Sequence, residues 1–136
     1  MQGEANRSVR VEALRHALLE LHKAMLDAQR IEYERAYGRV ETRGEFLGLV
    51  LNHAEFEWLR LLSALIAQLD EWAEGLDAES EGELDGIVQA LRSLIRRDGA
   101  NAAFSARYWQ MVESEPAVTV AHVKTWRLVE GAPGRE

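Results

Sequence analysis

The chain has 136 residues, of which 47% are hydrophobic, and it carries a net charge of −7 and no cysteine. Its length suits one domain and its apolar content is enough for a core, which excludes a disordered chain. The lack of cysteine excludes disulfides, thiolate zinc sites and cysteine nucleophiles. We expect a single domain over residues 1–136, with frayed ends at about 1–7 and 130–136.

Acidic residues are concentrated in the middle of the chain. Residues 44–86 hold eleven acids and one base, whereas residues 1–43 hold seven acids and eight bases and residues 87–136 hold five acids and seven bases. Phosphate binding needs a positive surface, so neither nucleic acid nor an anionic membrane is an expected partner. The first ten residues are polar, and no apolar run approaches the roughly 18 residues of a membrane span. We therefore expect no signal peptide and a bacterial cytoplasmic location.

The first predicted helix follows Ser8, a suitable N-cap, and ends near Tyr37, where Gly38 suits the left-handed position after a helix. At 1.5 Å per residue this helix is roughly 45 Å long. Its apolar residues recur at alternating spacings of four and three, which places them in one stripe on one face. The stripe consists of Leu14, Leu18, Leu21, Met25 and Ala28.

A second long helix is predicted from Thr42, which forms a T-x-x-E capping box with Glu45, to Gly75. The short connection after Gly38 makes the two long helices antiparallel. The main stripe of the second helix is Leu51, Ala54, Trp58, Leu62, Leu65, Leu69 and Trp72. A second stripe lies beside it, and we expect the remaining helices or another chain to cover it: Leu49, Phe56, Leu59 and Ile66.

Shorter helices are predicted in the rest of the chain. Ser80 and Glu83 form a capping box for a third helix that ends at Asp98-Gly99, with Arg96 and Arg97 in its last turn. Its apolar residues are Leu84, Ile87, Val88, Leu91, Leu94 and Ile95. Asn101 caps a fourth helix carrying Phe104, Tyr108, Met111 and Val112, and Glu115-Pro116 breaks it. A short fifth helix follows, and its predicted inward-facing residues are Val118, Ala121, His122, Thr125, Trp126 and Val129.

These patterns predict an all-α fold, because no strand pattern occurs anywhere in the sequence. The predicted arrangement is an antiparallel up-and-down bundle, in which two long helices are joined by two to three shorter ones.

Two H-x-x-x-E pairs, His16 with Glu20 and His53 with Glu57, raise the question of a di-metal centre. Their one-turn spacing resembles that of hemerythrin-like iron proteins, which implies iron bound inside a helical bundle. A rotation of about 100° per residue, however, places His16 about 150° and His53 roughly 135° from the centres of their stripes. We therefore expect both pairs to face water, and we assign no metal-ligating residue.

The other two histidines lie closer to the predicted core. His22 borders the first stripe, and His122 lies on the apolar face of the last helix. A histidine in such a position usually finds a hydrogen-bond partner. No serine or acid at an obvious spacing indicates a triad, so we assign no catalytic or cofactor-binding residue and no cofactor.

Residues 77–88 have the rhythm of a calcium loop, with Asp77, Glu79, Glu81, Gly82 and Asp85 at suitable positions. The position that needs a bidentate glutamate holds Val88, and Glu79 and Glu81 are longer than the usual Asp or Asn. The acids are also explained by the capping box and by the helix dipole.

Two sets of aromatic residues are candidates for a structural or functional role: the tryptophans, and two tyrosines that lie among arginines. The four tryptophans, at positions 58, 72, 109 and 126, all fall on apolar stripes, which predicts core packing. Tyr33 and Tyr37 lie near the first turn among Arg30, Arg35, Arg39 and Arg43. This end is either a solvated helix end or a site for an anion or an acidic partner.

The segment Leu14–Lys23 resembles the opening helix of a group of small, uncharacterised proteobacterial all-helical proteins. Further fragments share the resemblance, namely Tyr33-Glu34-Arg35, Trp58-Leu59-Arg60, Arg107-Tyr108 and Ala121-His122. The resemblance covers most of the chain and implies a helical fold, but it implies no activity.

The sequence favours a non-enzymatic protein-interaction or structural module that forms a homodimer or binds a protein partner through an apolar helix face. The alternative is a hemerythrin-like bundle that binds a metal or a small molecule, and a calcium-responsive module is a third hypothesis.

Overall fold

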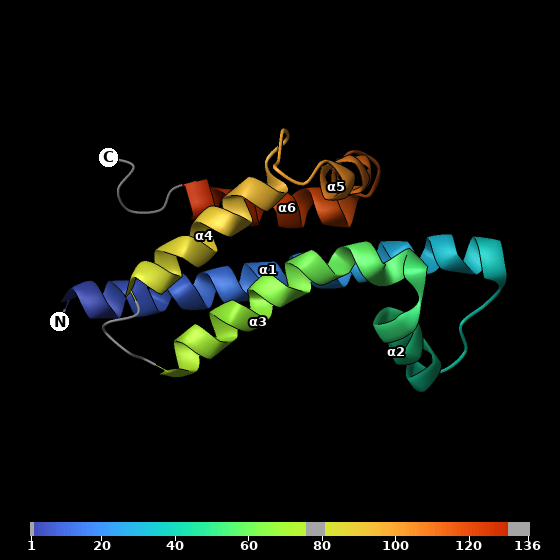
Figure 1. Cartoon of the computed structure of the whole chain (residues 1–136), viewed down its shortest axis with the longest axis horizontal. Coiled ribbons are helices and arrows are strands. Elements are labelled where there is room, and N and C mark those ends of the chain that lie inside the picture. The colour runs from blue at the N-terminus through green and yellow to red at the C-terminus, as the bar shows by residue number, and fades with distance from the viewer. Residues whose placement is uncertain (1, 76–80, 131–136) are drawn as a thin grey trace.

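In the computed structural model, which describes residues 2–75 and 81–130, the chain is helical and has no strand within those ranges. The elements are α1 (Gln2–Tyr37), α2 (Arg43–Asn52), the 3-10 helix η1 (Ala54–Leu59), α3 (Arg60–Gly75), α4 (Glu81–Ile95), α5 (Ala102–Ser114) and α6 (Pro116–Glu130) (Figure 1). The all-α prediction is confirmed. No helix in these ranges is both long and apolar enough to cross a membrane.

Helix α1 has 36 residues and is therefore about 54 Å long. It begins at Gln2, so Ser8 lies inside the helix and the prediction that Ser8 is its N-cap is wrong. The predicted end is confirmed, because Gly38 follows Tyr37 with a φ of 107° and donates its backbone N–H to Glu34 O at 2.9 Å. A residue with a Cβ atom is strained at that φ, which explains the glycine.

The prediction of one continuous helix from Thr42 to Gly75 is wrong, because the chain breaks at His53 into α2, η1 and α3. The capping side chain of Thr42 is where we predicted it, accepting from Glu45 N at 3.0 Å, but Glu45 reaches back to Glu41 N instead of Thr42 N. Figure 1 shows α2 folded away from α3. The break moves Phe56 and Leu59, which are 1% and 2% exposed, into the core. Burial of these side chains favours the break over the continuous helix.

Helix α1 packs most extensively against α6 and also contacts α3, while α4 contacts both α3 and α6. Figure 1 shows α6 running back along α1, so that the last helix lies against the first. Side-chain pairs join these helices at their edges. Arg15 Nε of α1 lies 2.8 Å from Asp70 Oδ1 of α3, and Lys124 Nζ of α6 lies 3.3 Å from Glu20 Oε1 of α1.

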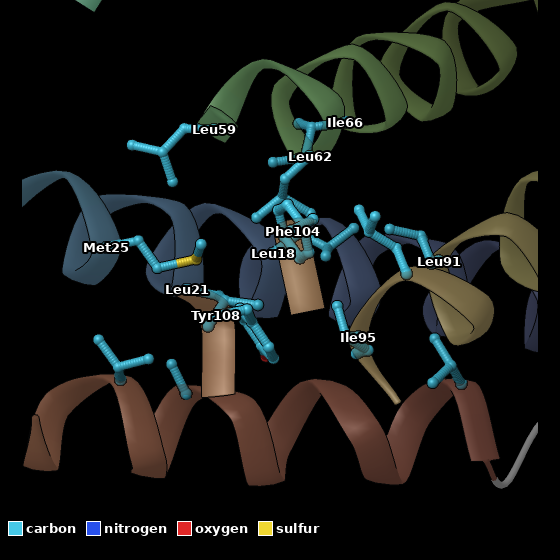
Figure 2. Close-up of a cluster of buried hydrophobic side chains, with 14 of the residues drawn as sticks. Leu18, Leu21, Met25, Leu59, Leu62, Ile66, Leu91, Ile95, Phe104 and Tyr108 are labelled. Carbon is cyan, nitrogen blue, oxygen red and sulfur yellow. The ribbon is translucent and has the colours of Figure 1, made fainter. Parts of the chain in front are cut away.

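The core lies between α1, α3, α4, α5 and α6 (Figure 2). Every residue of the predicted α1 stripe is buried. The buried residues of α3 are Leu62, Ile66 and Leu69, whereas Leu65, Trp58 and Trp72 of the predicted main stripe are half-buried and Leu51 and Ala54 are exposed. The break at His53 therefore turns residues of the predicted second stripe toward the core of the domain.

The last three helices follow the predictions closely. Asn101 accepts from Phe104 N at 2.9 Å, and all four predicted inward residues of α5 are buried. Helix α6 starts at Pro116 and, with 15 residues, is not shorter than α5; of its predicted inward residues, only Trp126 is half-buried. Helix α4 ends at Ile95, so Arg96 and Arg97 lie beyond its last turn, contrary to the prediction. Ser80, half of the predicted capping box, lies outside the described residues.

Candidate functional site

Helix α2 is built almost entirely of apolar residues and glycine after Glu45, yet it has no buried residue. Phe46, Leu49 and Val50 are half-buried and pack against the core, with the Phe46 ring 5.8 Å from the ring of Phe56. Leu47 and Leu51 lie one turn apart and are 58% and 59% exposed. This pair forms an apolar surface that no other part of the described chain covers.

Two glycines lie on the same side of α2 as the exposed leucines. At about 100° per residue, Gly44 and Gly48 fall within a quarter to a third of a turn of Leu47 and Leu51. A Cβ atom at either glycine would meet nothing within 4 Å. The surface formed by Gly44, Leu47, Gly48 and Leu51, which we call the α2 face, therefore offers open space beside two apolar side chains.

His53 separates α2 from η1 and caps both. Its backbone is extended, with φ −90° and ψ 139°, and its N–H donates to Leu49 O at 2.8 Å at the end of α2. Its ring nitrogen Nδ1 accepts the N–H of Glu55 at 3.0 Å at the start of η1. The ring contacts Tyr33 and Tyr37 edge-on, with centroid distances of 5.1 and 5.2 Å. One residue therefore caps both helices, α2 through its backbone N–H and η1 through its imidazole.

A buried polar network joins α1, η1 and α5 around Gln29, which is 0% exposed. Gln29 Oε1 accepts from Trp58 Nε1 at 2.8 Å and from Arg107 Nη2 at 3.0 Å, and Gln29 Nε2 donates to Glu55 Oε1 at 3.4 Å. The Arg107 guanidinium also lies 5.1 Å from the Trp58 ring centroid. Because a buried amide needs partners, this network fixes the relative positions of three elements.

Gln29 was not among the predicted functional residues, although the sequence contains a signal for it. Gln29 follows Met25 by four residues and so continues the stripe of α1 with a polar residue. A polar residue on an apolar stripe indicates a buried partner. The partners Trp58 and Arg107 belong to two fragments that carry the resemblance, but their meeting at Gln29 was not predicted.

A second polar pair lies between α5 and α6, where the Tyr108 hydroxyl and His122 Nδ1 are 2.5 Å apart. Burial raises the pKa of the Tyr108 hydroxyl well above its ordinary value, and burial, followed by the charge of Arg97, lowers the pKa of His122. Both groups are therefore neutral, and the imidazole tautomer decides which of them donates the hydrogen bond. The prediction of a hydrogen-bonded histidine in this helix is confirmed. Burial likewise lowers the pKa of His22.

The two H-x-x-x-E pairs do not come together. His16 is exposed on α1, and its neighbour Glu20 pairs with Lys124. His53 is half-buried at the break, where Nδ1 caps η1, while Glu57 is exposed. No three His, Cys, Asp or Glu residues in the described part of the chain are grouped as metal ligands.

The candidate calcium loop falls partly on residues 76–80, which lie outside the described residues and include Asp77 and Glu79. The described remainder, including Gly82 and Asp85, belongs to α4. A calcium loop needs a sharp turn at its sixth position, which is Gly82 here, and a regular helix does not supply that turn.

Arg30 and Glu34 organise the first turn, near which the other arginines and the tyrosines of the predicted cluster lie. Arg30 Nη2 donates to Val40 O at 2.9 Å, and the Glu34 carboxylate accepts from Val40 N at 2.9 Å and from Arg30 Nε at 3.3 Å. The Val40 bond, followed by the Arg30 contacts, lowers the pKa of Glu34. Arg35, Arg39 and Arg43 are exposed, and Tyr37 stacks on Tyr33 at 4.8 Å.

Comparison with known proteins identifies no relative of the chain. No protein-family model, no curated protein and no solved structure matches the chain.

Proposed function

We propose that the protein is a non-enzymatic interaction module that pairs with a second copy of itself through the α2 face. The observation that carries the proposal is the exposure of Leu47 and Leu51 on a helix that buries no side chain of its own. A helix of this composition is stabilised mainly by covering its apolar face. The open space beside Gly44 and Gly48 suits the close approach of another helix.

The charge of the chain favours a second copy at this particular face. Two copies with a net charge of −7 each repel one another over most of their surfaces. The segment from Phe46 to Asn52 contains no charged residue, so two copies can meet there without opposing carboxylates. The originally predicted stripe does not serve this purpose, because Phe56, Leu59 and Ile66 are buried within the chain.

The proposal includes the finer architecture and the setting of the protein. We take α1, α3, α4 and α6 as an antiparallel up-and-down bundle from which α2 projects. We also place the protein in the bacterial cytoplasm, among the small helical proteobacterial proteins that its segments resemble. A hemerythrin-like metal site gains no support from the separated positions of His16 and His53.

Sedimentation equilibrium over a wide range of protein concentrations tests the proposal. We expect a monomer–dimer equilibrium that the double substitution L47E/L51E shifts to monomer. The matched control is L19E on α1, where Leu19 is 53% exposed but lies on a different helix. A strict monomer at every concentration contradicts the proposal, as does equal weakening by L19E. Circular dichroism verifies that both variants keep their helix content.

A further inference from the structure

Burial of Phe56 and Leu59 favours the break at His53, but the position of α2 itself has only weak support from burial. Residues 43–75 contain no proline, and the sequence pattern by itself favours a continuous helix through position 53. Helix α2 has no buried residue, so packing contributes less to its position than to the position of any helix with a buried face. The hydrogen bond from Glu55 N to His53 Nδ1 is therefore a substantial part of what defines the junction.

That hydrogen bond requires one protonation state of His53. An imidazole nitrogen that accepts an N–H must carry a lone pair, so the proton of the neutral ring is on Nε2. A second proton converts Nδ1 into a donor, which then faces the N–H of Glu55 donor to donor. The positive charge also lies at the start of η1, where the aligned N–H groups are already positive.

We propose that His53 is a proton-sensitive hinge, whose neutral imidazole holds α2 folded away from α3 and whose protonated form releases α2 from that position. All groups of the hinge belong to one chain, so the inference does not depend on pairing through the α2 face. Histidine is the side chain that ordinarily changes charge near neutral pH.

Charged and titratable groups surround the hinge on every packed element. Tyr33 and Tyr37 of α1 contact the ring, and α2 contributes no charged residue after Glu45. The Glu55 carboxylate of η1 is held by Gln29, and Glu57 is exposed. Arg60 of α3 donates to Leu51 O at the end of α2, and Arg107 of α5 bonds Gln29. Among these groups, His53 is the one histidine.

Hydrogen exchange of backbone amides, measured by mass spectrometry from about pH 8 to about pH 5 and corrected for intrinsic rates, tests the hinge. The readout is the protection of α2 and η1 relative to α4, which carries no histidine and so reports any global loss of stability. In the natural chain we expect exchange of α2 and η1 to become about fivefold faster at low pH, the effect of losing one N-cap. Unchanged relative protection would overturn the hinge.

Two substitutions separate the imidazole proton from other acid effects. H53N keeps an acceptor at the cap but does not titrate, so we expect its α2 protection to be independent of pH. H53A removes the acceptor, so we expect at high pH the fast exchange that the natural chain shows at low pH. If H53N loosens in acid as the natural chain does, the proton acts elsewhere and the hinge is refuted, whether or not H53A folds.

Discussion

A hydrogen bond of 2.5 Å joins the Tyr108 hydroxyl and His122 Nδ1, and Tyr108 is 0% exposed. The two residues belong to α5 and α6, which a single extended residue, Glu115, connects. The rings of Trp109 and Trp126 lie 4.7 and 6.2 Å from the His122 ring and limit its access to water. The pair therefore acts as a polar fastening between the last two helices.

Removing the Tyr108 hydroxyl tests this fastening. In Y108F the aromatic ring remains, but His122 Nδ1 is left buried without its hydrogen-bond partner, which costs about 1–3 kcal/mol of the free energy of unfolding. Urea denaturation measures the loss. The matched control is Y37F, because Tyr37 is 59% exposed and its ring stacks on Tyr33. Equal effects of the two substitutions would show that the Tyr108–His122 bond contributes little.

Stability should fall in mildly acidic solution because of His22 and His122. Burial lowers the pKa of both in the folded chain, so the unfolded chain binds protons more tightly. Their contribution is complete above the ordinary histidine pKa of about 6.5 and is lost as pH falls through the lower folded values. Thermal melts at neutral pH and in mildly acidic solution measure the loss of stability. We expect the double variant H22Q/H122Q to flatten the pH dependence and H16Q, a surface substitution, to leave it unchanged.

The corrected inward face of α3 predicts unequal effects for neighbouring leucines. Leu62 is fully buried and Leu65 is half-buried. We expect L62A to lower the free energy of unfolding by about 2–5 kcal/mol and L65A to cost clearly less. Chemical denaturation compares the two variants directly. The opposite order would restore the stripe that the sequence pattern predicted and would place Leu65 in the core.

The Gln29 network predicts a penalty for an apolar substitution of similar length. Q29M leaves Trp58 Nε1 and Arg107 Nη2 without their shared acceptor, and we expect a loss of about 1–3 kcal/mol despite the added apolar surface. The control is Q89M on the exposed side of α4. Unfolding midpoints in urea give the comparison, and an unchanged midpoint for Q29M would mean that the network is dispensable.

Local signals explain which parts of the fold could be predicted. Helix α5 was predicted almost residue for residue, because Asn101 is a strong N-cap and Phe104 and Tyr108 lie one turn apart. The end of α1 was equally clear from Gly38. In each case the decisive residues lie within a few positions of the feature that they determine.

Features that depend on distant residues could not be predicted. The break at His53 needs a pocket for Phe56 and Leu59 formed by other helices, and no proline or glycine marks it. In the Gln29 network, Trp58 lies 29 positions and Arg107 lies 78 positions from Gln29 in the sequence. The α2 face was hidden for the same reason, because the continuous-helix prediction placed Leu51 in the core.

The extensive packing of α6 against α1 has a consequence for synthesis on the ribosome. Helix α1 is translated before α2 to α5, whereas α6, which packs most extensively against α1, is translated after them. Until α6 has been translated, α1 lacks its most extensive packing partner, so closure of the core around Leu18, Leu21 and Met25 is a late event. Slow translation of residues 38–115 therefore prolongs the interval before α1 and α6 can pack together.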